Sequence, residues 1–152
     1  VTLIHGTRDP NALDMVVIGN NFAEADRPLF ERRVRETITA LFGTDVFEDS
    51  PHAFNVWRSS IIEARFRFSL HGGLCFGPGD GAEYRRLLDM AEEELPDYDR
   101  VFLFFDGDIG GSIAGCATLG GLFIASDSVQ PGFTLPHELG PSVGSLADEY
   151  VN

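Results

Sequence analysis

The sequence predicts a single α/β domain built around one sheet, and two observations lead to this class. Short apolar runs rich in β-branched and aromatic residues are typical of buried strands. They alternate along the chain with two longer segments in which apolar residues recur every three or four positions. Alternating strands and helices are the pattern of α/β folds. The chain has 152 residues, which suits one domain with a sizeable core.

The expected strands form a twisted sheet of about four or five strands. Residues 13–19 are the first apolar run, and residues 54–58 are the second. In residues 61–68 apolar and polar side chains alternate, as in a half-buried strand. Residues 101–105 are continuously apolar, which predicts a central strand that is buried on both faces. Residues 122–125 form the last short strand.

Two amphipathic helices are expected between these strands. Residues 25–42 place apolar side chains on one helical face, and Gly43 supplies a stop. Residues 82–95 show the same pattern and are closed by Pro96. A third, short helix is expected to begin near Pro136.

The segments between these elements predict loops. Glycine-rich stretches cover residues 72–81 and 106–121. His5 lies in an end that we expect to be flexible, and His52 lies in a turn. The sequence contains no internal repeat, low-complexity tract or domain linker. We therefore expect residues 1–152 to form one domain.

Charge excludes some classes of partner. The net charge is −13, and all eleven basic residues are arginine. Nucleic acid is not an expected partner, because phosphate binding needs a basic surface. No apolar run approaches the ~20 residues that span a bilayer, so membrane insertion is not expected. No signal peptide is visible in the sequence.

The most informative stretch begins at His137 and Glu138. In the pattern His-Glu-x-x-His, two imidazoles one helical turn apart hold a zinc ion, and the glutamate acts as general base on the metal-bound water. Here the second histidine position is occupied by Pro141. Two acidic residues, Asp148 and Glu149, follow at a distance where a carboxylate ligand would serve.

This segment resembles the active site of the IgA-specific metallopeptidase family, His-Glu-x-Gly-His-Ser-x-x-x-Leu-Ala-Asp-Glu-Tyr. Nine positions match, namely His137, Glu138, Gly140, Ser142, Leu146, Ala147, Asp148, Glu149 and Tyr150. The resemblance continues upstream in residues 14–22, in Leu41-Phe42, in residues 54–57 and in Gly110-Gly111. It covers most of the chain from about residue 13 to residue 150.

The resemblance implies a zincin-like (metzincin-related) domain, a twisted mixed sheet with a backing helix at residues 25–42 and an active-site helix at His137. It implies a zinc cofactor and hydrolysis of peptide bonds. By this correspondence His137 is the first zinc ligand, Glu138 is the general base, and Asp148 or Glu149 is the acidic third ligand. Such a domain is expected to be secreted, periplasmic or at the cell surface. This chain would be the N-terminal part of a longer catalytic domain.

The resemblance also implies that an edge strand lines the cleft and binds an extended peptide by strand addition. We assign this role to residues 122–125. Gly120, Gly121, Leu122 and Phe123 are therefore the expected contacts with a peptide or protein substrate. The glycines would let the two backbones approach closely.

Pro141 leaves two functions open. Proline has no metal-binding side chain, and inside a helix it costs ~3 kcal/mol or more. Zinc held by His137 and one carboxylate has two protein ligands, whereas catalytic sites have three. That number would be restored if Asp148 and Glu149 both bind, or if a residue beyond Asn152 supplies a ligand. The chain is then either a zinc-dependent endopeptidase or a degenerate pseudopeptidase that binds peptide without turnover.

Overall fold

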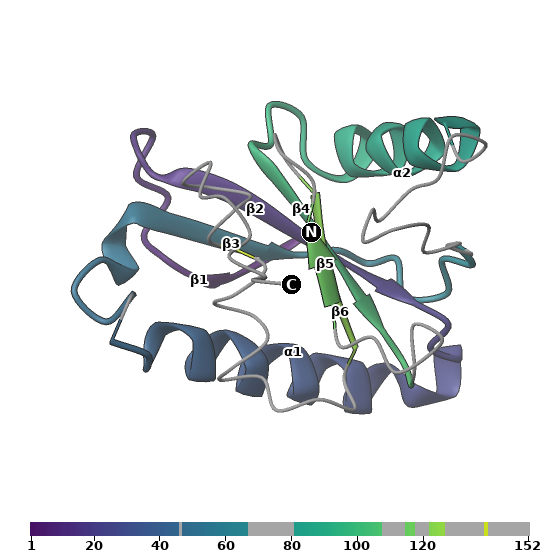
Figure 1. Ribbon diagram of the computed structural model, residues 1–152, viewed down its shortest axis with the longest axis horizontal. Helices are drawn as coiled ribbons and strands as arrows, with labels where there is room; N and C mark the ends of the chain where they lie inside the picture. The colour runs from purple at the N-terminus through teal and green to yellow at the C-terminus, as the bar shows by residue number, and fades with distance from the viewer. Residues whose placement is uncertain (46, 67–80, 108–114, 118–121, 127–138, 140–152) are drawn as a thin grey trace, which may run out of the picture.

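A mixed sheet of six strands forms the centre of the molecule, with helix α1 on one face and helix α2 on the other (Figure 1). The computed structural model describes residues 1–45, 47–66, 81–107, 115–117, 122–126 and 139. The two faces of the sheet support separate buried clusters, one packed on α1 and one packed on α2. The predicted α/β class with a single mixed sheet is therefore confirmed.

The strands follow the order β1-β3-β2-β4-β6-β5 across the sheet. Their bounds are β1 Thr2–His5, β2 Leu13–Asn20, β3 Phe54–Arg58, β4 Arg100–Phe105, β5 Gly115–Ala117 and β6 Leu122–Ser126. The four inner strands run parallel, and β1 and β5 pair antiparallel to their neighbours at the two edges. The sheet has more strands than the sequence predicts, because neither edge strand was expected.

Strand β4 shows why a continuous apolar run is needed at the centre of the sheet. Phe102 and Phe104 belong to the cluster on the α1 face, whereas Val101, Leu103 and Phe105 belong to the cluster on the α2 face. Successive side chains of a strand point to opposite faces, so a strand covered on both faces needs an apolar side chain at every position. The prediction of a central strand buried on both faces is confirmed.

Helix α1, Arg27–Phe42, covers one face of the sheet and follows a short 3₁₀ turn at Glu24–Asp26. Its buried residues recur at three- and four-residue spacing, and they are Phe30, Val34, Thr37, Ile38 and Leu41. Burial of a side chain such as Phe30 stabilises the fold by about 1.5–3 kcal/mol. The helix ends at Gly43, whose N–H donates to the Thr39 carbonyl at 3.1 Å. The prediction for residues 25–42 is confirmed.

Helix α2, Gly81–Glu94, covers the opposite face. Leu87 and Ala91, one turn apart, are fully buried against that face, and Tyr84 and Leu88 pack beside them. Its bounds agree with the predicted helix at residues 82–95 to within a residue.

The first residues are not flexible, and this expectation was wrong. Strand β1 pairs with β3, and the His5 Nε2 donates to the Pro51 carbonyl at 2.8 Å. The His5 ring also stacks on Phe42 with 4.1 Å between centroids. All of these partners come from distant parts of the sequence, so no local sequence pattern predicts these contacts.

The predicted strand at residues 61–68 is also wrong for the residues that the structure describes there. In the register between β2 and β3, Asn20 would face Ile61, but it bridges to Ala64, three residues further along. Extra residues therefore bulge out and end the regular ladder. The alternation of burial is nevertheless present, with Ile62, Ala64 and Phe66 buried and Glu63 and Arg65 exposed. The last two residues of the expected strand lie outside the described residues.

Candidate functional site

Most residues predicted to form the metal centre and the substrate contacts lie outside the described residues. They are Gly120, Gly121, His137, Glu138, Asp148 and Glu149, and Pro141, the altered ligand position, lies outside the described residues as well. Their roles stay predictions. The structure instead describes three features around them: one residue of the His-Glu segment, the strand edge assigned to the peptide, and the carboxyl end of the sheet.

Leu139, which directly follows the His-Glu pair, is helical and fully buried. It belongs to the cluster on the α1 face, together with Phe104 of β4 and Ala125 of β6. A leucine at 0 % exposure joins the packed core rather than a solvent-facing loop. The segment that resembles a zinc-peptidase helix is therefore attached to the core at this residue, on the same face as α1.

The strand assigned to the peptide is not an edge strand. Phe123 pairs with Phe102 of β4 on one side and with Ala117 of β5 on the other. The expectation that residues 122–125 form the edge is therefore wrong, because residues within the expected glycine-rich loop return as β5 and pair with β6. In the described part of the sheet, this edge is Gly115–Ala117.

The sequence contains no strong signal for β5. Gly-Cys-Ala is short and lacks the β-branched residues that mark strands. Its pairing with β6 matches Gly115 to Ala125 and Ala117 to Phe123. An edge strand presents backbone N–H and C=O groups along its outer side, and among the described strands β5 is the one at this edge of the sheet.

The parallel strands end at the same edge of the sheet. Asn20 of β2 is opposite Phe105 of β4, which is opposite Ser126 of β6. The Asp106 N–H, just beyond β4, donates to the Asn20 carbonyl at 3.0 Å. In open α/β sheets ligands bind beyond the carboxyl ends of the strands. This edge and the β5 side of the sheet therefore frame the region where a substrate site is expected.

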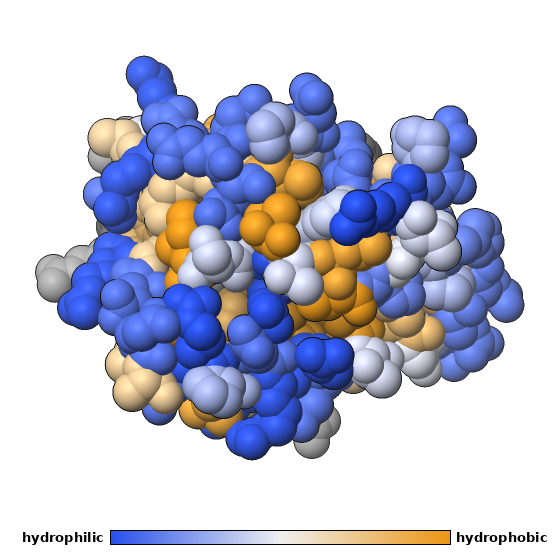
Figure 2. All heavy atoms as spheres, turned by 180° about the vertical axis from the view of Figure 1, so that it is seen from behind, coloured by the Kyte–Doolittle hydropathy of each residue, from blue (hydrophilic) through white to orange (hydrophobic). Residues whose placement is uncertain are grey.

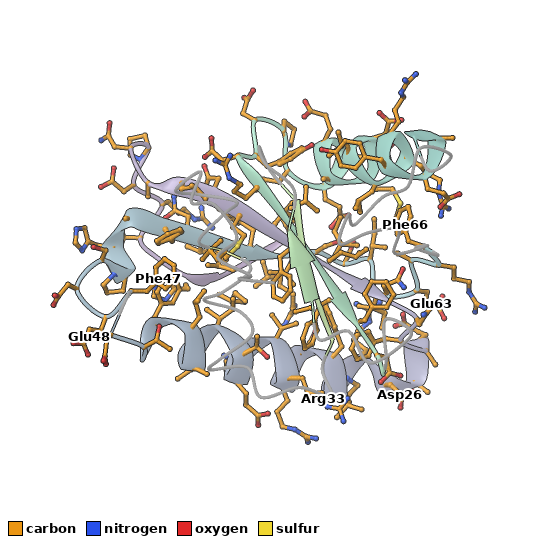
Figure 3. The ribbon with its side chains drawn as sticks, viewed as in Figure 1. Asp26, Arg33, Phe47, Glu48, Glu63 and Phe66 are labelled. Carbon is orange, nitrogen blue, oxygen red and sulfur yellow. The ribbon has the colours of Figure 1, made fainter. Side chains whose placement is uncertain are left out.

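Charged side chains surround the carboxyl end (Figure 3). Arg33 of α1 lies 3.5 Å from the Asp106 carboxylate, and both groups are more than a third exposed. Figure 3 shows Asp26 and Glu63 at this same end of the molecule, whereas Phe47 and Glu48 lie at the opposite end. Such exposed pairs contribute at most about 1 kcal/mol, so their effect is on the local field rather than on stability.

Arg27 and Glu24 form a second pair near this end, with 2.6 Å from Arg27 Nε to a Glu24 oxygen. The hydrogen bond from Arg27 holds the pKa of Glu24 below its ordinary value. Among the described residues, no three His, Cys, Asp or Glu side chains, Glu24 included, are grouped closely enough to hold a metal ion.

Comparisons with known proteins add no identification. No family model matches the chain, and no curated protein matches it. No helix within the described ranges is long and apolar enough to cross a membrane. A function for this chain therefore rests on its own residues and geometry.

Proposed function

We propose that this chain is a zincin-like (metzincin-related) domain that acts as a zinc-dependent metallo-endopeptidase. The observation that carries the proposal is the burial of Leu139. A helical, fully buried leucine within the His-Glu segment supports an active-site helix packed on the α1 face rather than a chance sequence match.

The helical period relates the buried position of Leu139 to the positions of its neighbours around the helix. Successive residues of an α-helix are about 100° apart, so the residue two positions before a core-facing leucine lies on the opposite side of the helix. In the proposed helix the His137 imidazole would therefore be directed away from the core, where a metal and a substrate would have access. Leu139 shares its buried cluster with Ala125 of β6, the strand next to β5. In the proposed arrangement the catalytic helix would pack beside β6, next to the edge strand that binds the peptide.

The proposed donor set is His137, Asp148 and Glu149. One imidazole and two carboxylates make three protein ligands, which is the number found in catalytic zinc sites with water at the fourth position. The set fits zinc only when both carboxylates bind, since Pro141 supplies no donor. Bound there, zinc would supply Lewis-acid polarisation of the scissile carbonyl.

The remaining steps belong to the chain itself. The peptide backbone pairs with β5, which holds the scissile bond in an extended conformation. Glu138 accepts a proton as the attacking water forms its bond to the carbonyl carbon. It then donates that proton to the amine as the carbon–nitrogen bond breaks.

Metal content and cleavage test the proposal together. The purified chain, dialysed against zinc and then against buffer, should retain about one zinc per chain. It should cleave an unstructured protein such as casein, and a chelator should stop the cleavage. Retained zinc without any cleavage, across a range of unfolded protein substrates, would contradict the endopeptidase proposal.

A second candidate is a pseudopeptidase, and Pro141 favours it. Without an imidazole at this position, the site falls to two ligands if Asp148 and Glu149 do not bind together. The edge strand would still accept a peptide, because strand addition uses backbone groups only. Peptide binding by a chain that holds no metal, with no cleavage after zinc is added, would identify this function.

A further inference from the structure

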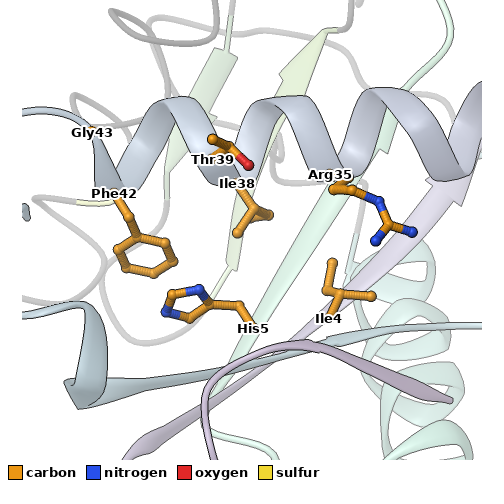
Figure 4. A pocket seen from close by; sticks show the side chains of 7 residues that line it. All are labelled: Ile4, His5, Arg35, Ile38, Thr39, Phe42 and Gly43. Carbon is orange, nitrogen blue, oxygen red and sulfur yellow. The ribbon is translucent and has the colours of Figure 1, made fainter.

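A cavity of about 300 Å³ lies between α1 and β1, at the opposite edge of the sheet from β5 (Figure 4). It is lined by Ile4, His5, Arg35, Ile38, Thr39, Phe42 and Gly43. Such a volume is at the small end of the range for ligand pockets, which is about 300–1,000 Å³. Figure 2 shows the molecule from the opposite side to Figure 1, and on this face apolar residues gather between polar ones.

The helical side of the cavity follows from the period of α1. Arg35, Ile38, Thr39 and Phe42 are spaced by three and four residues, which places them on one face of the helix. That face carries one cation, one hydroxyl and two apolar groups. The remaining wall comes from Ile4 and His5 of β1, so the cavity exists only because β1 pairs at this edge of the sheet.

One end of the cavity is a rigid pair of rings. The His5 and Phe42 planes are inclined by 14° at a centroid distance of 4.1 Å. A carbonyl oxygen can only accept, so the His5 Nε2 carries the proton that it donates to Pro51, and this bond fixes the ring. Aromatic walls held in this way favour a flat or branched apolar group beside them.

The other end carries the guanidinium of Arg35, which has no carboxylate partner in the part of the chain that the structure describes. Arg32 and Arg33 on the same helix lie beside Glu36 and Asp106, respectively. Arg35 forms no ion pair with any residue that the structure describes. Figure 4 shows its side chain at the end of the cavity opposite the two rings. A guanidinium binds a carboxylate through two parallel N–H donors, which makes it suited to this ligand group.

We propose that the cavity binds a small monocarboxylate with an aromatic or branched apolar body, such as an arylacetic acid. Its carboxylate contacts Arg35 and the Thr39 hydroxyl, and its body packs between Ile4 and Ile38 against the two rings. Arg35 lies about two turns before the end of α1 at Phe42, so this orientation places the negative charge at the end of the cavity farther from the last helix carbonyls, which repel anions. The site is separate from the proposed peptidase site.

Phenylacetate is the probe, and phenylacetamide, which has the same shape without the charge, is its control. Methyl NMR of the full chain should show phenylacetate shifting the Ile4 and Ile38 signals in a saturable way. Phenylacetamide should bind about tenfold more weakly or worse, since a hydrogen bond to a charged group contributes about 1.5–3 kcal/mol. Arg35→Gln should weaken phenylacetate by a similar factor, and Arg32→Gln on the same helix should leave it unchanged.

Thr39→Val is a second variant at an exposed position, and it should weaken phenylacetate binding by less than Arg35→Gln does. The carboxylate chemistry is shared by a free acid and by the last residue of a peptide, so a tetrapeptide ending in Phe is compared with its amide. Tighter binding of the peptide acid than of phenylacetate would assign the site to chain termini. Equal binding of phenylacetate and its amide, or no effect of Arg35→Gln, or unmoved Ile4 and Ile38 signals would overturn the proposal.

Discussion

The side chain of Asn20 pairs with the backbone of Phe66 through both of its amide atoms. Its Oδ1 accepts from the Phe66 N–H at 2.8 Å, and its Nδ2 lies 3.4 Å from the Phe66 carbonyl. Both residues are buried, so water cannot replace these contacts. At the end of β2 the asparagine thus takes the place of a neighbouring strand and holds residues 61–66 beside β2, beyond the end of the regular ladder with β3.

Asn20→Ala should therefore destabilise the protein substantially. The substitution removes two hydrogen bonds to the buried backbone of Phe66, which costs about 1–3 kcal/mol. Urea unfolding measures this change in free energy. Asn11→Ala, at an exposed position, is the matched control and should change stability by less than about 0.5 kcal/mol. Similar losses in the two variants would mean that the Asn20 bonds are not specifically stabilising.

Glu94 should make stability depend on pH in the acidic range. Burial raises the pKa of this carboxyl, but hydrogen bonds from Ser59 and Ser60 together outweigh it, and the pKa falls below its ordinary value of 4.5. A carboxyl whose pKa is lower in the folded state adds stability above the unfolded value. That stability is lost as pH falls through the folded value.

Glu94→Gln tests this dependence. The stability difference between the original chain and the variant should be largest at neutral pH and should shrink steadily below pH 4.5, as measured by urea unfolding at several pH values. Glu93→Gln, an exposed neighbour, should show no such trend. A difference that stays constant down to acid unfolding would contradict the role of the ionised Glu94.

Pro141→His should increase zinc affinity, because it restores the imidazole that the peptidase pattern requires. Four-ligand zinc sites bind with about 10–16 kcal/mol, or roughly 3 kcal/mol per ligand, which is on the order of a hundredfold. Calorimetric titration with zinc measures the gain. Pro141→Ala relieves the proline without adding a ligand, so it separates the two effects. Equal affinities in the histidine and alanine variants would count against this segment as a zinc-binding helix.

Glu138→Ala should abolish peptide cleavage while leaving the zinc content unchanged. A general base contributes about 10²–10⁴ in rate, and this residue is assigned to proton transfer rather than to metal binding. Turnover of a quenched fluorescent peptide and elemental analysis give the two readouts. Glu92→Ala, an exposed residue of α2, is the control and should retain activity. Cleavage that survives in Glu138→Ala would show that another group acts as the base.

The sequence by itself determined the elements whose burial is periodic. Helix α1 shows its core face through Phe30, Val34 and Leu41, and β4 shows double burial through an unbroken apolar run. These patterns are local, because a helix or a strand imposes its own period on the side chains it buries. The His-Glu segment was also readable from the sequence, and Leu139 is the one residue of it that the structure describes.

Only the tertiary structure decided which strands lie at the edges. Nothing in Gly115–Ala117 marks it as a strand, and residues 2–5 become β1 only through pairing with β3. The cavity beside Arg35 and the bond from Asn20 to Phe66 likewise join residues that are far apart in the sequence. Pairing of this kind depends on register and on which backbone groups remain unpaired after folding, and neither property is recorded in a local run of side chains.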